Sequence, residues 1–380
     1  MNRPIRISVL APVLAASMQP APSAAQELRA VTLPARVACA ECTVVFDTLF
    51  IIEDTEPYWL GDRLTLSKPD SRGRYHGSSF FTDPGVIQVV DQFGRRVGNY
   101  GHGSGAGPGE GRGMTAPYIA PGDTAYVWDF LQRRITVWAP DEKLVRQFNA
   151  PGRISSVLFL DSGDLLLGAT VQTRAHAGLP LHIVNRVTGE IAHSFGADPP
   201  TMRFDNPSLI TRYLARSNSG GFLAAHASEY VIEVWDSNRR KRSEIRRVVD
   251  WFSSDRSTSD DDSYVTAVWQ DRQGLIWIVV DTPDANRAEN EKRLEDRGDG
   301  MGKYSGPADW HGLNDTVIEV IDPDRGVVVA SRRFEEYITT QGAGAPLIVY
   351  RADAEGNPRF DVLVPRLVQR GRDFKPDPVK

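Results

Sequence analysis

The chain has 380 residues, which is enough for one large domain or two ordinary ones. Hydrophobic residues make up 41% and charged residues 24%, a composition that excludes a disordered chain and a membrane-spanning one. The formal net charge of −5 argues against a nucleic-acid binder that works through a positive field, and two cysteines exclude a disulfide-rich scaffold.

The first 25 residues have the layout of a secretory signal. Arg3 and Arg6 precede an apolar run over 7–16, and small residues follow up to Ala25. The run is too short to span a bilayer, so we expect cleavage after Ala25 and export to the periplasm or the cell exterior. No later stretch approaches 18 uninterrupted apolar residues, and no membrane span is expected in the mature chain.

An N-terminal extension over 26–42 ends in Cys39 and Cys42, which form a C-A-E-C motif. In an oxidising compartment we expect these two cysteines to form a disulfide. A redox-active dithiol would need a thioredoxin-like strand and helix, and the strand-like TVVFDTLFII that follows does not supply one. Two thiolates alone cannot complete a zinc site, so no metal is assigned to them.

A repeat of about 48 residues runs through the chain. Each repeat has an apolar strand, a polar turn and a second strand, and the turns begin at Asp91, Ala139, Asn185, Asp236 and Asp322. These positions are 48, 46, 51 and 86 residues apart, and the last spacing indicates one period plus an insert near 283–314. A second hairpin with its own Gly-rich or Asx-rich turn precedes each pair, so the unit is four short antiparallel strands.

Four-stranded units at this period predict an all-β fold, a six-bladed β-propeller of four-stranded antiparallel blades. The last hairpin supplies only half a blade, and we expect an early strand over 43–53 to join it and close the ring. The propeller then covers 43–370, followed by a tail over 371–380. A helix is expected only near 287–297, inside the insert. Seven blades, or a double-sheet sandwich, are the alternatives. The five complete blades are predicted at about 57–100, 114–150, 151–197, 207–250 and 262–335.

Two adjoining segments, NYGHGSGAGPGEGRG (99–113) and APYIAPGDTAYVWDFLQRRITVW (116–138), resemble the NHL-type six-bladed propellers of secreted bacterial (TolB-like or NHL-like) proteins. Gly111 departs from the pattern, since an aromatic residue is usual there. The resemblance implies a six-bladed propeller but no single activity. The residues that match the family motif are Gly105, Gly107, Pro108, Gly109, Glu110, Val127, Asp129, Arg134 and Ile135.

The long connections of such a propeller would all lie on one face, because second-to-third-strand turns and blade-to-blade connections alternate with the short turns. We therefore expect binding on that face, with Tyr304 and Trp310 of the insert as exposed anchors for a protein partner. The connections concerned are 99–113, 169–180, 197–207, 250–263 and 283–314.

The innermost strands are predicted to bring basic residues to the channel. Arg153, Arg212, Arg216 and Arg351 lie on or beside these strands and would suit an anionic small molecule or an acidic peptide. The alternative is that half of them point between blades and pair with acids, because strand side chains alternate.

No catalytic motif appears, and a serine nucleophile elbow is absent, so a binding module is favoured over an enzyme. The alternative is a lyase or hydrolase that acts on a small molecule or glycan, with catalytic groups from His176, His226, Glu229 and His311. No cofactor is predicted. Calcium at the acidic segment around Asp255 and 260–262 would be a weak exception, because the D-x-D-x-D-G spacing is missing. A nucleic-acid partner is not expected, and the expected oligomeric state is a monomer.

Overall fold

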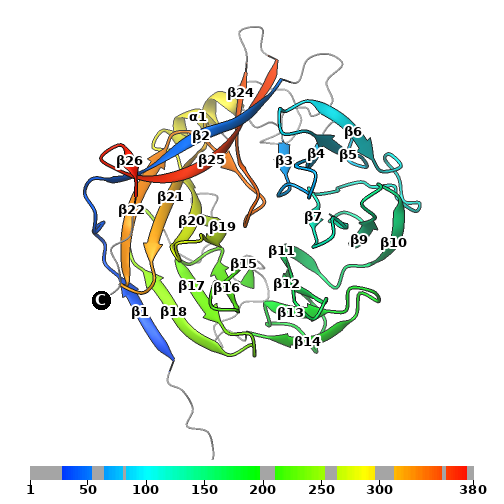
Figure 1. The fold of residues 1–380 in the computed structure, drawn as a ribbon, viewed down its shortest axis with the longest axis horizontal. Coiled ribbons are helices and arrows are strands. Elements are labelled where there is room, and N and C mark those ends of the chain that lie inside the picture. Colours follow the sequence, from blue (N-terminus) through cyan, green and yellow to red (C-terminus); the bar gives the residue numbers. More distant parts are fainter. Residues whose placement is uncertain are drawn as a thin grey trace, which may run out of the picture.

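The computed structural model describes residues 28–53, 64–79, 83–196, 210–252, 263–295, 312–352 and 357–374. Within these residues the strands form six antiparallel sheets arranged in a ring around a central channel (Figure 1). Each sheet has a core of four strands, so the predicted six-bladed β-propeller is confirmed.

The blades follow one another in chain order, each running from an inner strand at the channel to an outer strand at the perimeter. Blades 1 to 3 contain β3 (Leu64–Leu66), β4 (Tyr75–Ser79), β5 (Ile87–Val90) and β6 (Arg96–Tyr100); β7 (Tyr118–Ile119), β8 (Ala125–Asp129), β9 (Arg134–Trp138) and β10 (Leu144–Asn149); and β11 (Arg153–Phe159), β12 (Leu165–Thr170), β13 (Leu181–Val184) and β14 (Ile191–Phe195). Blades 4 to 6 contain β15 (Arg212–Arg216), β16 (Phe222–His226), β17 (Val231–Trp235) and β18 (Lys241–Arg247); β19 (Tyr264–Gln270), β20 (Ile276–Pro283), β21 (Asn314–Asp322) and β22 (Val327–Phe334); and β23 (Ile338–Thr339), β24 (Leu347–Ala352), β25 (Pro358–Gln369) and β2 (Cys42–Glu53).

Three of the turns that define the repeat are closed by the side chain of their first residue. The carboxylate of Asp91 accepts hydrogen bonds from the backbone amides of Phe93 and Arg95, at 2.9 and 3.0 Å. Asn185 and Asp322 accept the amides two and three residues further on in the same way. This Asx-turn chemistry explains why Asp and Asn recur at the turn entry.

The hydrophobic core lies between neighbouring blades rather than in one central cluster. On β20, the side chains of Ile276 and Ile278 pack with blade 4, whereas Trp277 and Val279 pack with blade 6. Because both faces of such a middle strand are covered, the strand reads as a continuous apolar run instead of an alternating one.

The ring is closed by the N-terminal strand, as predicted. β2 pairs antiparallel with β25 along its whole length, from Cys42 opposite Gln369 to Glu53 opposite Arg359. The hairpin strand β26 (Arg372–Asp373) extends the same sheet. The disulfide between Cys39 and Cys42 is also present, at the start of this closing strand.

The innermost strand of blade 6 differs from the prediction. Arg351 is predicted on or beside an innermost strand, but it lies in β24, the second strand of the blade. The inner position belongs to the two-residue strand β23, which pairs Ile338 with Val349. A strand this short carries no readable alternation, which is why the sequence did not reveal it.

The N-terminal extension forms an additional strand that the repeat did not predict. β1 (Arg29–Leu33) runs parallel to β18 and makes a fifth strand at the outer edge of blade 4 (Figure 1). The chain then passes blade 5, where the amide of Ala38 donates to the carbonyl of Val328 at 2.7 Å, and enters β2 in blade 6. The segment therefore covers the outer edge of blade 4 and contacts that of blade 5 before it becomes the outer strand of blade 6, and this cover protects edge strands from pairing with other chains.

The predicted helix in the blade 5 insert is present as α1 (Arg287–Glu295), in the connection between β20 and β21. No helix among the described residues is long and apolar enough to cross a membrane. The predicted signal segment lies outside the described residues.

Candidate functional site

A cavity of about 1200 Å³ opens at one end of the channel. Its walls come from residues where inner strands begin and second strands end, such as Arg153 at the start of β11 and Thr170 at the end of β12. This is the end at which blade-to-blade connections and second-to-third-strand turns lie. The cavity is therefore on the face that carries the long connections.

The described residues around the cavity carry positive charge and no negative charge. Arg133 and Arg153 are among them, whereas Asp, Glu, His and Lys are absent from that lining. Both arginines are exposed, and neither guanidinium has an ion pair or hydrogen bond to a side chain or backbone group in the described part of the chain. Elsewhere arginines such as Arg74 and Arg366 are paired with carboxylates. A free guanidinium in a hollow suits a carboxylate or phosphate ligand.

Local turn geometry holds the two arginines at the blade 2 and blade 3 side of the mouth. Arg133 lies in the turn between β8 and β9 with a φ of 51°, and its carbonyl accepts the amide of Ala150 at 2.8 Å. Arg153, at the start of β11, lies three residues after Ala150. In that strand Ser155 donates to the carbonyls of Gly168 and Arg212, at 2.8 and 2.9 Å, and so fixes blade 3 against blade 4.

Aromatic side chains complete the mouth and the channel below it. Tyr118, Tyr213 and Tyr264 come from the inner strands of blades 2, 4 and 5, and Trp128 and Phe130 from the end of β8 and the turn after it. Burial, with the nearby Asp281, raises the pKa of Tyr213 to about 12. Burial also raises the pKa of Tyr118. Both phenols stay neutral and can donate a hydrogen bond.

The four arginines predicted for one basic mouth do not lie together. Arg153 lines the cavity, and Arg212 is fully buried below it, beside the lining residues Thr211 and Tyr213. Arg216 ends the same strand as Arg212, at the opposite end of the channel, where it pairs with Asp161 at 3.0 Å. Arg351 lies outside the cavity, paired with Asp361 and Glu336.

Two of the predicted catalytic residues are brought together in blade 4. The ring nitrogens of His226 lie 3.5 Å from Glu229 and 3.3 Å from Glu233, and Lys241 lies 3.2 Å from Glu233. Burial alone would raise the pKa of Glu233, but the hydrogen bond from His226 and the charges of His226, Arg212 and Lys241 lower it to about 2. Residue 226 directly precedes Ala227, which lines the cavity.

His176 belongs to a hydrogen-bond chain in blade 3. The hydroxyl of Ser194 lies 2.9 Å from Nδ1 of His176 and 2.8 Å from Nδ1 of His182, and Nε2 of His182 lies 3.2 Å from the carbonyl of Ala169. Because a carbonyl only accepts, Nε2 of His182 carries the proton, and Ser194 donates to Nδ1. Burial lowers the pKa of His182 to about 4, so the ring is neutral at pH 7. These hydrogen bonds anchor the connection that contains His176 to the sheet of blade 3.

The remaining predicted residues of the long-connection face fall outside the described residues. They are His311, Tyr304 and Trp310 of the insert and the acidic segment at Asp255 and 260–262. Among the residues that the structure describes, no group of three or more His, Cys, Asp or Glu side chains is placed to hold a metal ion. Calcium binding at the acidic segment stays a prediction.

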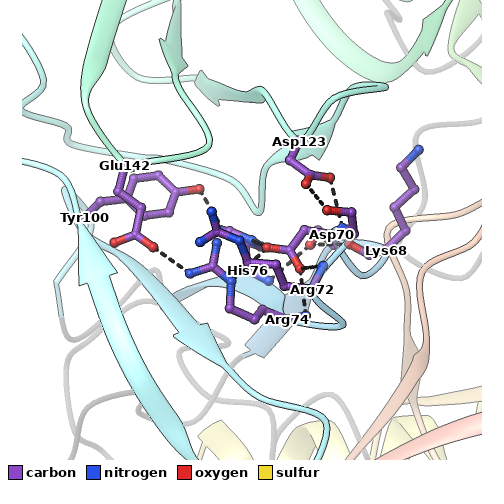
Figure 2. Close-up of polar contacts among 10 residues, drawn as sticks. Lys68, Asp70, Arg72, Arg74, His76, Tyr100, Asp123 and Glu142 are labelled. Carbon is purple, nitrogen blue, oxygen red and sulfur yellow. Dashed lines mark hydrogen bonds and ion pairs between the residues drawn. The ribbon is translucent and has the colours of Figure 1, made fainter.

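The opposite face carries a polar network that joins blades 1 and 2 (Figure 2). Asp70 accepts from Arg74 at 2.8 Å and lies 3.3 Å from His76, while Arg74 also donates to Glu142 of blade 2 at 2.8 Å. Nδ1 of His76 lies 3.2 Å from the hydroxyl of Tyr100. Burial lowers the pKa of buried His76, although Asp70 opposes this effect. Each of these five side chains makes a polar contact with another of the five, which indicates a structural link between the two blades.

Sequence reasoning missed Arg133 and Trp128 as cavity residues. Arg133 lies in a second-to-third-strand turn, so the rule that assigns these turns to the long-connection face would have placed it there. The length of this turn does not mark it as a binding connection, because the turn is short.

Comparisons with known proteins support the fold. A Bacteroides fragilis protein named as exported matches over 90% of this chain and 100% of its own length, with 9% identity and a TM-score of 0.57. A DUF4221 family member from Bacteroides vulgatus matches over 86% of this chain and 99% of its own, with 11% identity and a TM-score of 0.56. A virginiamycin B lyase from Staphylococcus aureus aligns over 85% of this chain and 99% of its own, with 9% identity and a TM-score of 0.44.

No protein-family model matches the chain, and no curated protein matches it. The resemblance to NHL-type proteins therefore stays a prediction. Identities this low show a shared fold alone. The chain is a six-bladed β-propeller similar in fold to these Bacteroides proteins.

Proposed function

We propose that this protein is an exported binding module that takes an anionic ligand in the cavity at the channel mouth. The observation that carries the proposal is the charge of the described lining, which contains two arginines without a partner and no acid. Guanidinium groups bind carboxylates and phosphates bidentately, and a partly enclosed cavity strengthens that attraction. The predicted signal segment and the disulfide at Cys39 and Cys42 support export.

The experiment uses ligand pairs that differ only in charge, such as a carboxylate and its amide, titrated into the protein by calorimetry. The charged member is expected to bind more tightly, and raising the salt concentration should weaken it. Arg153→Gln and Arg133→Gly should each weaken binding by about tenfold or more, because a hydrogen bond to a charged group contributes about 1.5–3 kcal/mol. Gly suits the φ of 51° at position 133, so this variant removes the cation without adding backbone strain.

Arg272→Gln is the matched control. Arg272 is exposed in the first turn of blade 5, on the opposite face. Its substitution should therefore leave the affinity unchanged. Equal binding of the charged and neutral ligands, or full affinity in both cavity variants, would show that the cavity does not select anions.

A lyase or hydrolase is the second candidate. The observation in its favour is that His226 lies between Glu229 and Glu233, one residue from the cavity lining. An imidazole between carboxylates can exchange protons with a bound substrate once it is accessible. The test is product formation from a ligand that binds the cavity, with His226→Gln as the variant. An identical turnover in that variant would remove this candidate.

A further inference from the structure

Each of the six blades contributes a side chain with a hydroxyl group to the cavity lining, in addition to the two cations. Blade 1 contributes Thr65, blade 3 contributes Ser155, and Thr340 follows the inner strand of blade 6. Blades 2, 4 and 5 contribute the phenols of Tyr118, Tyr213 and Tyr264. Every blade therefore carries an uncharged side chain with a hydroxyl group at the same end of the channel.

The phenols of Tyr118 and Tyr213 have no hydrogen-bond partner among the described residues, whereas the hydroxyl of Ser155 is already used between two backbone carbonyls. The amides of Gln172 and Gln341 add further donors and acceptors to the wall. Such groups bind uncharged hydroxyls of a ligand in both directions, as donor and as acceptor.

The charge lies on one side of the cavity, whereas side chains with hydroxyl groups lie all around it. Arg133 and Arg153 lie on the side of blades 2 and 3, together with the aromatic faces of Trp128 and Phe130. The described lining from blades 4 to 6 is uncharged, with Tyr213, Tyr264 and Thr340. A complementary ligand has an acid group at one end and many hydroxyls along the rest of its length.

We propose that the ligand is an acidic saccharide, such as a short uronate oligosaccharide, with a carboxylate between Arg133 and Arg153 and sugar hydroxyls against the tyrosines of blades 2, 4 and 5. This inference rests on the proposed function. The volume of about 1200 Å³ exceeds the roughly 300–1,000 Å³ of ordinary small-molecule pockets, so it has room for more than one sugar ring. An acidic peptide would use the cations equally well but has few hydroxyls for the remaining wall.

The test compares three ligands by calorimetry on the full chain: a galacturonate trisaccharide, the same trisaccharide with its carboxyl groups reduced to alcohols, and a glutamate tetrapeptide. The galacturonate trisaccharide should bind at least about tenfold more tightly than either of the others. If the peptide binds as tightly or more tightly, the anion site stands and the saccharide assignment is wrong. If none of the three binds, the saccharide proposal falls, and screening with other anions decides on the anion site separately.

Single hydroxyl deletions test the contacts of the sugar with the tyrosines. Tyr118→Phe and Tyr213→Phe keep the ring and remove one hydroxyl. Each should lower the affinity for the trisaccharide by about threefold to tenfold while leaving any binding of the peptide unchanged. Tyr75→Phe is the control, because Tyr75 lies in blade 1 outside the cavity lining. Unchanged trisaccharide affinity in both variants would overturn the proposed orientation of the sugar.

Discussion

Cys42 and Gln369 lie opposite each other across β2 and β25, although 327 positions of the chain separate them. The pair marks the start of a register that continues to Glu53 and Arg359. Closing the ring in this way joins the two ends of the propeller, so the blade that shapes one wall of the channel depends on a strand from the N-terminus. Stability of the ring should therefore respond to single buried residues of β2.

Ile52 and Ile51 provide a direct test of that dependence. Ile52 is fully buried in the cluster between blades 6 and 1, whereas the side chain of Ile51 on the other face is exposed. Ile52→Ala should lower the free energy of unfolding by about 2–5 kcal/mol, because it removes buried methyl groups and leaves a cavity. Ile51→Ala is the control and should cost less than about 1 kcal/mol. Equal losses in urea unfolding would contradict the role of β2 as the closing strand.

The disulfide at the start of β2 should add a smaller increment. Cys39 and Cys42 are three positions apart, so the closed loop has four residues, and the chain-entropy relation gives about 2 kcal/mol for it. Reduction, or the double substitution Cys39→Ala with Cys42→Ala, should lower Tm by a few degrees. Scanning calorimetry with and without reductant measures the shift. An unchanged Tm after both thiols are shown to be free would mean that packing alone holds this turn.

The sequence predicted the ring because its signals are local. Asp91 and Asp322 close their own turns through neighbouring amides, so the turn entry is readable from a few residues. The closing strand followed from the half blade at the C-terminus. β1 could not be predicted, because its residues are mostly exposed and its partner β18 lies more than 200 positions away.

The candidate site was predicted only in part, for a reason of strand geometry. Arg212 and Arg216 lie at the two ends of one strand, about 13 Å apart at about 3.3 Å per residue, so they reach opposite ends of the channel. Side chains also alternate along that strand. Tyr213 lines the cavity, and Arg212 beside it is buried instead. A single sequence does not fix which of the two sets faces the channel.

His182 should make the protein less stable in mild acid. Its pKa is lowered to about 4 in the folded chain, chiefly by burial, against about 6.5 in the unfolded chain, so the unfolded state binds the proton first. The contribution of His182 to the free energy of unfolding is complete above pH 6.5. It is lost as the pH falls toward 4, and the loss is about 2 kcal/mol at pH 5. In His182→Gln, the loss between pH 7 and pH 5 in urea unfolding should be smaller by that amount. His193→Gln, an exposed neighbour on β14, should keep the full loss.

Glu233 should also contribute less stability in acid, but for a different reason: its partners favour its charged form, whereas burial disfavours the charged form of His182. Its folded pKa of about 2 lies below its ordinary value of 4.5, because the hydrogen bond from His226 and the charges of His226, Arg212 and Lys241 outweigh burial. Its contribution to stability is therefore complete above pH 4.5 and is lost as the pH falls toward 2. Glu233→Gln should cost about 3 kcal/mol at pH 6, since it leaves buried cations without their acid.

The cost of Glu233→Gln should shrink by about 1.4 kcal/mol at pH 3.5, where protonation has already removed part of the native contribution. Glu190→Gln, on an exposed turn of blade 3, is the control and should stay within about 0.5 kcal/mol of the parent at both pH values. Urea unfolding at pH 6 and pH 3.5 measures the difference. A cost for Glu233→Gln that is the same at both pH values would mean that shape, and not the charge of the carboxylate, stabilises the centre of blade 4.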